Sequence, residues 1–483
     1  MPDLTHVDDY PEIPVSLQTS RAVLRTGDWR NVRPYLAERA SACTAECPAA
    51  VPIPRYFHHL AAGRLEEAFA AFTLRNPFPG VTGRVCPRSC EVGCSRTDRE
   101  GPISIRDLER YLGDRTAHLA HPAPAVESGR RVAVVGSGPA GLSAAYYLRR
   151  GGHQVTVLEA LPHPGGMLRY GIPEYRLPSR IVDGEIERLE EMGIRFQTDV
   201  DLGGRVSLTG LEDEFDAVFV ATGAWESRTM GIDGEHLLES GLDFLVDSHR
   251  ACVGPSGDRC AVIGGGNTAL DVARMLRRLG AETTVLYRRT EAEMPAIAEE
   301  YRSAVEEGVR FEFLTLPRAI ARDGRELVVS VERMELGAPD DSGRRRPEPT
   351  GEVGERRYHT VYSAIGERAS LEAFPSELLG DDGWLQVGES GETRDEKVFV
   401  GGDLASGPAT VVEAIAAGRR AAAAIGRRIG GGFEEPAWVA EQADGVVGPG
   451  DVNPSTFPAC EPHHGPHLDA RQRLAAGLAE EAG

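Results

Sequence analysis

The sequence of 483 residues predicts an α/β protein in which a helical N-terminal domain precedes two domains of alternating strands and helices. The α/β part is predicted by a pattern that occurs twice, near residues 131 and 260: a short apolar strand, a glycine-rich turn and a helix. A separate N-terminal domain is predicted because five of the eight cysteines lie within residues 43–94. Two strand–turn–helix units of this kind in one chain predict two Rossmann-like dinucleotide-binding domains.

Composition narrows the class of protein. Hydrophobic residues make up 41% of the chain and charged residues 26%, which is typical of globular proteins. The apolar runs are strand-sized and the first ten residues lack the apolar segment of a signal peptide, so we expect a cytoplasmic protein without membrane contact. A net charge of −21 argues against nucleic acid as a partner, because a phosphate-binding surface needs clustered positive charge.

The predicted helical domain covers residues 1–125 and ends in a proline-rich stretch at 121–125. A disulfide scaffold is not expected in a large cytoplasmic chain, so its cysteines indicate metal ligands. Spacings of three residues, and prolines directly after two of the thiols, favour iron–sulfur ligation over zinc, which prefers two CxxC-type pairs. The cysteines of this group are Cys43, Cys47, Cys86, Cys90 and Cys94.

The remaining cysteines lack such partners. Cys260 begins an apolar strand and is predicted to lie in the core, and Cys252 stands alone. Cys460 lies near His463 and His464, which is a weak metal pattern in a segment rich in proline and glycine.

The first glycine motif follows the strand Arg131–Val135 and opens a helix over 142–150. In such a motif the first glycine allows the tight turn, the second lets the backbone approach a pyrophosphate, and the third lets helix and strand pack closely. The helix N-terminus supplies amides to the phosphates, and an acidic residue after the next strand accepts hydrogen bonds from the ribose. The predicted contacts are Gly136, Gly138, Pro139, Ala140, Gly141 and Glu159.

A later segment assigns this first site to FAD. A strand ends in Gly402 and Asp403, and Ala409 and Thr410 then open a helix over 411–424. The amides at that helix start suit the negative charge of a reduced flavin, and Asp403 is placed to hold the ribityl chain. A nicotinamide cofactor needs neither feature, so FAD is predicted here.

Another apolar strand, which begins at residue 216, ends at Thr222 and Gly223, where the chain is expected to leave the FAD-binding domain. That domain is therefore predicted to be discontinuous, over 128–225 and 362–430, with the second dinucleotide-binding domain inserted at 226–361. Residues 431–483 are predicted to form an extended tail with a short helix near 470–482.

The second glycine motif contains Gly264 and Gly266, with alanine in the place of the third glycine. Asn267 and Thr268 follow on the first helical turn, where Asn267 can reach a pyrophosphate. The strand Glu282–Tyr287 ends in Arg288 and Arg289, at the place where an NAD site usually has a carboxylate. Because arginine pairs with a 2′-phosphate, NADPH is favoured over NADH.

Four segments together resemble the family of the glutamate synthase small (beta) subunit, which includes the NADPH-oxidising half of dihydropyrimidine dehydrogenase. They are residues 76–94 (NPFPGVTGRVCPRSCEVGC), 108–114 (LERYLGD), 165–178 (GGMLRYGIPEYRLP) and 287–296 (YRRTEAEMPA). The similarity covers roughly residues 35–430, and the motifs occur in the family's order.

This resemblance implies further site residues. Segment 165–177 would cover the flavin ring through Gly166, Met167, Gly171 and Ile172, and the two arginines at 288 and 289 would bind NADPH. The family's N-terminal domain holds two [4Fe–4S] clusters, and the ligands of one map here to Cys47, Cys86, Cys90 and Glu109.

A second cluster would need Cys43, Cys94 and two cysteines upstream, but the matching positions near Tyr35 and Glu38 are not cysteine. One cluster is therefore predicted, and Cys43 and Cys94 are left as spare or alternate thiols.

The predicted function is electron transfer by a subunit that moves a hydride between NADPH and FAD, and electrons through the cluster to or from a separate catalytic or ferredoxin-type subunit. The flavin carries the chemistry, so no protein residue is predicted to be catalytic. A hetero-oligomer is expected, because no glutaminase, molybdenum or thiamine-type signature occurs in the chain. The alternatives are the glutamate synthase small subunit itself, a structural subunit that binds cofactors without turnover, and a reductase that acts directly on a small molecule.

Overall fold

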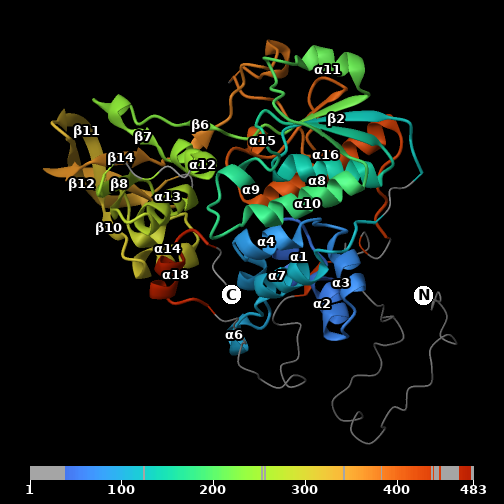
Figure 1. The fold of residues 1–483 in the computed structure, drawn as a ribbon, viewed down its shortest axis with the longest axis horizontal. Coiled ribbons are helices and arrows are strands. Elements are labelled where there is room, and N and C mark those ends of the chain that lie inside the picture. The colour runs from blue at the N-terminus through green and yellow to red at the C-terminus, as the bar shows by residue number, and fades with distance from the viewer. Residues whose placement is uncertain are drawn as a thin grey trace, which may run out of the picture.

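A computed structural model gives the architecture, and it describes residues 39–122, 126–251, 254, 257–340, 343–381, 383–436, 439, 445–447 and 467–479. A helical N-terminal part lies beside two parallel sheets with their covering helices (Figure 1). Within these residues no helix is long and apolar enough to cross a membrane. Cys252, Cys460, His463 and His464 fall outside the described residues.

The N-terminal part consists of short helices that lie beneath the first sheet in Figure 1. The buried positions of α7 recur with helical spacing at Ile105, Glu109 and Leu112, which places a carboxyl group on the buried face. Helix α7 crosses α4 at van der Waals distance, because a Cβ on Gly113 would lie 2.4 Å from the backbone nitrogen of Gly80. The helices are α1 (Ala42–Glu46), α2 (Ile53–Ala61), α3 (Leu65–Phe72), α4 (Pro79–Val85), α5 (Ser89–Val92), α6 (Thr97–Glu100) and α7 (Ile105–Thr116).

The first sheet is parallel, with the strand order β16–β5–β2–β3–β4. Its central strands are almost continuously apolar and buried, as expected for a parallel sheet with helices on both faces. The strands are β2 (Arg131–Val135), β3 (Gln154–Leu158), β4 (Arg195–Gln197), β5 (Ala217–Val220) and β16 (Val398–Val400). The associated helices are α8 (Pro139–Arg150), α9 (Met167–Tyr170), α10 (Ser179–Glu191), α11 (Leu208–Glu214), α15 (Asp403–Ser406) and α16 (Val411–Ile429).

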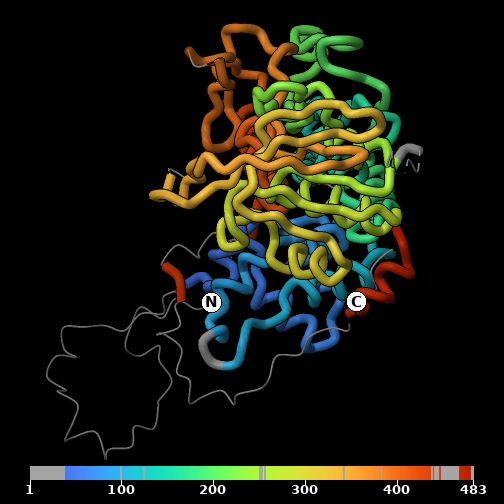
Figure 2. The backbone as a smooth tube through the Cα atoms, turned by 90° about the vertical axis from the view of Figure 1, so that its left-hand side faces the viewer, coloured from blue at the N-terminus to red at the C-terminus, as the bar shows by residue number. Residues whose placement is uncertain are grey.

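The second sheet is also parallel, with the order β10–β9–β8–β14–β7. Its strands are β7 (Glu239–Ser240), β8 (Arg259–Ile263), β9 (Glu282–Tyr287), β10 (Arg310–Phe313) and β14 (Thr360–Ser363). Its helices are α12 (Gly241–Ala251), α13 (Asn267–Arg278) and α14 (Ala298–Glu306), with short 3₁₀ turns at Glu235–Leu237 and Glu291–Glu293. The antiparallel strands β11 (Thr315–Asp323), β12 (Glu326–Pro339) and β13 (Arg345–Tyr358) lie on the outer side of this sheet (Figure 2).

Two short antiparallel strands connect the sheets, β6 (Glu226–Ser227) on the outward path and β15 (Glu367–Arg368) on the return. A 3₁₀ turn at Ser376–Leu378 follows on the way back to the first sheet. The predicted boundary between residues 361 and 362 falls inside β14, which pairs with β7 and β8. The boundary therefore moves to beyond Ser363, because the apolar strand that precedes it completes the second sheet.

The C-terminal segment contacts all three parts in its described residues. Strand β17 (Val446–Val447) pairs with β1 (Ala40–Ser41) beside the N-terminal helices. Helix α18 (Ala470–Ala476) lies against α14, where the buried Arg473 pairs with Glu306 and Glu307. The short helix was expected from the sequence, but its ion pairs with the second sheet's helices were not.

Candidate cofactor sites

One cavity lies where the carboxyl ends of the two sheets meet, and most of the residues predicted to hold cofactors line it. Loops after β2, β5 and β16 form one side and the start of α13 forms the other. Doubly wound sheets bind ligands in this position, outside the carboxyl ends of their strands. The predicted residues in the lining are Gly136, Gly138, Pro139, Ala140, Gly166, Met167, Gly171, Ile172, Thr222, Gly223, Asn267, Thr268, Gly402, Asp403, Ala409 and Thr410.

The glycines of the first motif differ in their backbone conformation and in the space around them. Gly136 has a φ of +99°, and a Cβ there would lie 2.4 Å from the carbonyl oxygen of Ala221. A Cβ on Gly141 would lie 1.9 Å from the carbonyl oxygen of Gly136, so the helix can approach the strand only without a side chain. Nothing lies within 4 Å of a Cβ on Gly138, which leaves its backbone open at the start of α8. This open cradle fits a dinucleotide pyrophosphate.

Glu159 is buried at the end of β3 but does not line the cavity. Its Oε2 accepts hydrogen bonds from the amide, at 3.0 Å, and the hydroxyl of Ser137, and its Oε1 accepts one from the amide of Leu161 at 2.8 Å. The carboxylate therefore fixes the glycine-rich loop from the strand end at which a ribose is expected.

The end of the cavity at which the flavin is predicted is formed by the segment between β16 and α16. Asp403 accepts a hydrogen bond from the amide of Ala409 through Oδ1, at 3.2 Å, and burial raises the pKa of its carboxyl to about 6. Thr410 and Glu413 form a capping box at the start of the 19-residue helix α16. The positive end of that helix dipole thus faces the cavity, as the FAD prediction requires.

Segment 165–177 folds over the cavity beside the first glycine loop. A Cβ on Gly166 would lie 2.8 Å from the Cα of Gly138, and one on Gly171 would lie 2.6 Å from the sulfur of Met167. Gly166 lets the two loops pack backbone against backbone, whereas Gly171 leaves room for the Met167 side chain of its own segment.

The second glycine motif repeats this arrangement. Gly264 has a φ of +146°, and a Cβ there would lie 2.1 Å from the carbonyl oxygen of Ala364. Nothing lies within 4 Å of a Cβ on Gly266, so this backbone is open at the start of α13. Asn267 lines the cavity, and its Oδ1 accepts a hydrogen bond from the amide of Ile297 at 2.9 Å.

The two arginines after β9 lie in different environments. Arg288 is exposed, whereas Arg289 is buried. Arg289 donates to the carbonyl oxygen of Arg345 at 2.8 Å and pairs with Asp340 at 2.5 Å. Arg289 therefore anchors the β12–β13 hairpin, and only Arg288 is presented to the outside.

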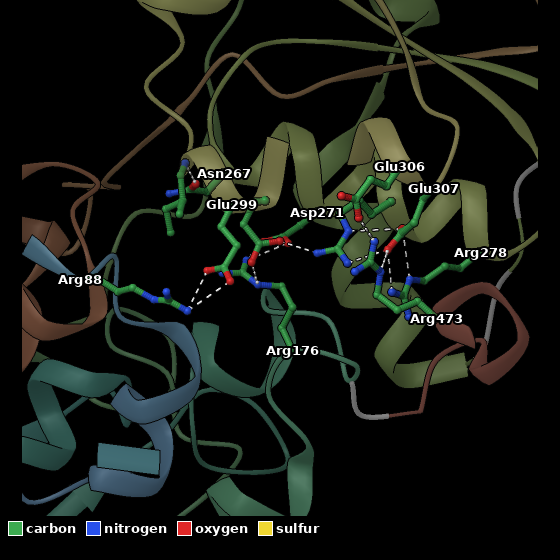
Figure 3. Close-up of polar contacts among 12 residues, drawn as sticks. Arg88, Arg176, Asn267, Asp271, Arg278, Glu299, Glu306, Glu307 and Arg473 are labelled. Carbon is green, nitrogen blue, oxygen red and sulfur yellow. Dashed lines mark hydrogen bonds and ion pairs between the residues drawn. The ribbon is translucent and has the colours of Figure 1, made fainter. Parts of the chain in front are cut away.

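A buried ion network that the sequence did not single out crosses the cavity rim (Figure 3). Arg176 lies near the end of segment 165–177. Its Nη1 donates to both carboxylate oxygens of Asp271, at 2.8 and 2.7 Å, and its Nε lies 3.0 Å from Glu300. Burial raises the pKa of the Asp271 carboxyl to about 6, against the opposing effect of Arg176. The network thus joins the flavin side to the helices of the second sheet.

In the N-terminal part, Cys47, Cys86, Cys90 and Glu109 line one small cavity, as predicted for a set of cluster ligands. The four residues come from the ends of α1 and α4, from α5 and from α7. The Oε1 of Glu109 accepts hydrogen bonds from the hydroxyl of Thr82 and, at 3.4 Å, from the Nδ2 of Asn76. Three thiols and a carboxylate in one buried cavity match the donors of an iron–sulfur cluster.

The acidic groups of this cavity are held in their protonated forms when no metal is bound. Burial raises the pKa of the Cys86 thiol to about 12 and that of the Glu109 carboxyl to about 8. These groups are neutral without a metal and release protons when they bind one. Among the described residues no three Cys, His, Asp or Glu side chains are placed to hold a single metal ion. A [4Fe–4S] cluster makes a different demand, because each of its ligands binds a different iron atom.

Cys43 and Cys94 do not line that cavity. The hydroxyl of Ser41 lies 3.2 Å from the Cys43 sulfur, and burial, with a further effect of Cys94, raises the pKa of the Cys43 thiol. The two thiols therefore form a neighbouring pair, and the upstream positions 35 and 38 fall outside the described residues.

Comparison with known proteins gives the family. Residues 130–418 match the family model of the pyridine nucleotide-disulphide oxidoreductases, and residues 36–120 match that of dihydropyrimidine dehydrogenase domain II, 4Fe-4S cluster. The structure of FprA from Mycobacterium tuberculosis in complex with NADPH aligns with a TM-score of 0.54 and 23% identity, over 65% of this chain and 90% of that one. This likeness confirms the fold of the two-dinucleotide part.

Curated relatives match over most of the chain. The beta subunit of the NADP(+)-dependent formate dehydrogenase of Moorella thermoacetica is 40% identical over 82% of this chain and 60% of its own length. The beta subunit of the NADPH-Fe(3+) oxidoreductase of Geobacter sulfurreducens is 39% identical over 82% of this chain and 65% of its own length. The chain thus spans less than two thirds of these relatives.

The small chain of the NADPH glutamate synthase of Halomonas elongata is 35% identical over 79% of this chain and 87% of its own length. This match and the two family models cover the helical part and both dinucleotide-binding parts in one order. The chain belongs to the glutamate synthase small-chain family of NADPH-dependent FAD and iron–sulfur oxidoreductases.

Proposed function

We propose that this chain exchanges a hydride between NADPH and FAD and passes electrons through a [4Fe–4S] cluster to or from a separate partner protein. FAD supplies the conversion between two-electron hydride transfer and one-electron transfer when it is bound. The residues of the chain bind and align the cofactors, and none is proposed to be catalytic.

The observation that carries the proposal is how closely the two cavities adjoin. Val85 and Pro87 line the large cavity, whereas Cys86 between them lines the cluster cavity. At the start of α16, Val411 lines the large cavity and the next residue, Val412, lines the cluster cavity. Single residues therefore separate the site proposed for the flavin from a ligand proposed for the cluster, which supports direct electron transfer between them.

The chain's own residues align the reaction. The loops of Gly138 and Gly166 and the N-terminal amides of α8 are proposed to hold the FAD pyrophosphate, and Asp403 its ribityl chain. Asn267 and Thr268 approach the same cavity from the second sheet, where a nicotinamide would meet the flavin. Segment 165–177 would exclude water from this contact.

We propose that NADPH is the preferred nucleotide and that Arg288 binds its 2′-phosphate. Its exposed guanidinium follows β9, at the usual position of the group that recognises the 2′-substituent. Arg289 supports this site from behind through the hairpin that it anchors.

The partner is proposed to be a catalytic or ferredoxin-type subunit in a cytoplasmic hetero-oligomer. Support comes from the relatives, which are named as subunits of a formate dehydrogenase, an Fe(3+) oxidoreductase and a glutamate synthase. The positions of Tyr35 and Glu38 lack the cysteines of the family's second cluster, which favours a partner other than the large chain of glutamate synthase.

The test is to measure FAD, iron and acid-labile sulfide on protein purified without oxygen, and to record EPR spectra after NADPH is added. We expect about four irons per FAD and a signal that NADPH induces. Bound FAD without iron would contradict the relay and favour a direct reductase.

A cysteine variant separates the two steps. C86S is expected to keep FAD and its reduction by NADPH but to lose the cluster signal. C260S is the matched control, because Cys260 is a buried thiol on β8 of the second sheet and does not line the cluster cavity, and it is expected to keep both FAD reduction and the cluster signal. Loss of the signal in both variants, or in neither, would contradict the ligand role of Cys86.

A further inference from the structure

A buried tyrosine lies in the cluster cavity without a hydrogen-bond partner. Tyr56 of α2 is fully buried, and it lines the cavity together with Cys47, Cys86, Cys90 and Glu109. Its hydroxyl makes no hydrogen bond in the described part of the structure. Buried polar groups in native proteins nearly always have a partner, so an unpaired hydroxyl in a ligand cavity indicates a group that the bound state supplies.

The ring of Tyr56 is fixed from two sides. Phe57 packs edge-on at 4.8 Å between ring centroids, and Phe72 of α3 does so at 5.2 Å. Such packing leaves the ring little rotational freedom, so the direction of the hydroxyl is set by the apolar core around it. Phenylalanine would satisfy this packing equally well, and the hydroxyl therefore needs a separate explanation.

The neighbouring polar side chains bond to one another and not to Tyr56. Glu109 receives hydrogen bonds from Thr82 and Asn76, both at Oε1, and Asn76 donates to Thr82 at 2.8 Å as well. A phenol has an ordinary pKa near 10 and is a donor at neutral pH. The Tyr56 hydroxyl therefore borders the space between the three thiols and the carboxyl group of Glu109.

We propose that the Tyr56 hydroxyl donates a hydrogen bond to the iron–sulfur cluster, at a sulfide or a ligand sulfur, and thereby raises its reduction potential. The proposal rests on the cluster proposed above and adds a residue that is not a ligand. Hydrogen bonds to cluster sulfurs stabilise the reduced, more negative state, because they place positive charge density beside it. Tyr56 would thus make the cluster easier to reduce from the flavin.

The experiment is a redox titration of the cluster EPR signal on the holoprotein. Y56F removes only the hydroxyl and is expected to lower the midpoint potential while FAD and iron contents stay as in the wild type. Y146F is the matched control, because Tyr146 of α8 is equally buried and lines neither cavity. Its hydroxyl donates to the carbonyl oxygen of Thr73 at 3.4 Å and accepts from Arg150 at 3.3 Å. Y146F is expected to leave the potential unchanged.

A second substitution acts in the opposite direction. Tyr56→3-fluorotyrosine keeps the ring and the hydroxyl but makes the hydroxyl a stronger donor, so the midpoint potential is expected to rise. If Y56F does not retain iron, this variant decides alone. An exchangeable proton coupled to the cluster, seen by pulsed EPR in H₂O against D₂O, is expected in the wild type and not in Y56F.

The outcomes separate the two proposals. Iron-loaded wild type, Y56F and fluorotyrosine proteins with equal potentials would overturn the role of Tyr56 and leave the cluster in place. Wild-type protein without iron and sulfide would contradict the cluster itself, and with it this proposal. Opposite shifts in the two variants would support a direct hydrogen bond.

Discussion

At the scale of single residues, the structure distinguishes side chains that the sequence treats alike. Arg288 and Arg289 are adjacent in one motif, yet one is exposed and the other is buried in an ion pair with Asp340. Glu109 and Asp403 share a different property, because each is a carboxyl group whose pKa burial raises next to a proposed cofactor.

The first prediction concerns nucleotide choice. R288A is expected to lower kcat/KM for NADPH about 10- to 100-fold, because a charge-assisted hydrogen bond to the 2′-phosphate contributes about 1.5–3 kcal/mol. The kcat/KM for NADH, which lacks that phosphate, should hardly change. R310A serves as the control, since the side chain of Arg310 is 70% exposed on the same sheet and pairs only with Glu282 among the partners given by the structure. An equal loss with both nucleotides would argue against this role.

The second prediction concerns Asp403 and pH. Its folded-state pKa of about 6 lies above the ordinary value of 3.8, so the FAD-free protein loses stability as pH rises from about 4 to 6 and stays less stable above that range. D403N removes this penalty and is expected to stabilise the FAD-free protein by about 3 kcal/mol at pH 7, and by only about 0.5 kcal/mol at pH 4. Denaturant unfolding at both pH values measures this difference.

The same substitution should weaken FAD binding, since an amide is a poorer acceptor for ribityl hydroxyls than a carboxylate. FAD retention after dialysis is the readout. Tighter retention in D403N would contradict the proposed contact.

At the scale of elements, close approach of helices explains the glycines of the N-terminal part. Helices α4 and α7 carry Cys86 at the end of one and Glu109 in the other, so their separation sets the ligand positions. That separation depends on Gly83 and Gly113, since a Cβ on Gly83 would lie 2.3 Å from the backbone nitrogen of Arg110 and one on Gly113 would lie 2.4 Å from that of Gly80.

The third prediction tests this packing. G113A would place a methyl group 2.4 Å from the backbone of Gly80, so the helices must separate, and we expect destabilisation by about 1–3 kcal/mol with loss of iron. G184A is the matched control, because Gly184 lies inside α10 with nothing within 4 Å of a Cβ. It should be neutral or stabilise by up to about 1 kcal/mol. Thermal unfolding and iron content check both, and an iron-replete G113A protein of normal stability would refute the argument.

At the scale of the whole molecule, buried and partly buried ion pairs hold the three parts together. Arg88, between two proposed cluster ligands, donates to Glu299 of α14 at 3.1 Å, and Glu300 next to it pairs with Arg176 and Arg274 (Figure 3). The series of ion pairs continues to Arg278, whose Nη2 lies 2.8 Å from Glu307. Arg473 of α18 pairs with the same carboxylate. The network fixes the second sheet against the flavin side and the cluster side at once.

The fourth prediction is a double-mutant cycle on this network. R176M leaves Asp271 and Glu300 buried beside one another with less compensating charge, and should destabilise the protein by about 3–5 kcal/mol. Adding D271N removes one of the stranded carboxylates and should recover part of that loss. Chemical unfolding of the single and double variants gives the coupling, and strictly additive effects would show that the pair does not interact.

The sequence by itself determined the two strand–turn–helix units, their order and most of the residues that line the large cavity, because each glycine motif reflects a local requirement: a positive φ at Gly136 and Gly264, and an open backbone at Gly138 and Gly266. Only the tertiary structure decided what depends on residues far apart in the chain. It placed β14 in the second sheet, paired Arg289 with Asp340, and packed α18 against α14. It also brought Arg176 to Asp271, and Tyr56 to the proposed cluster ligands. Local motifs cannot encode such pairs, because burial and partnership arise only when distant segments pack together.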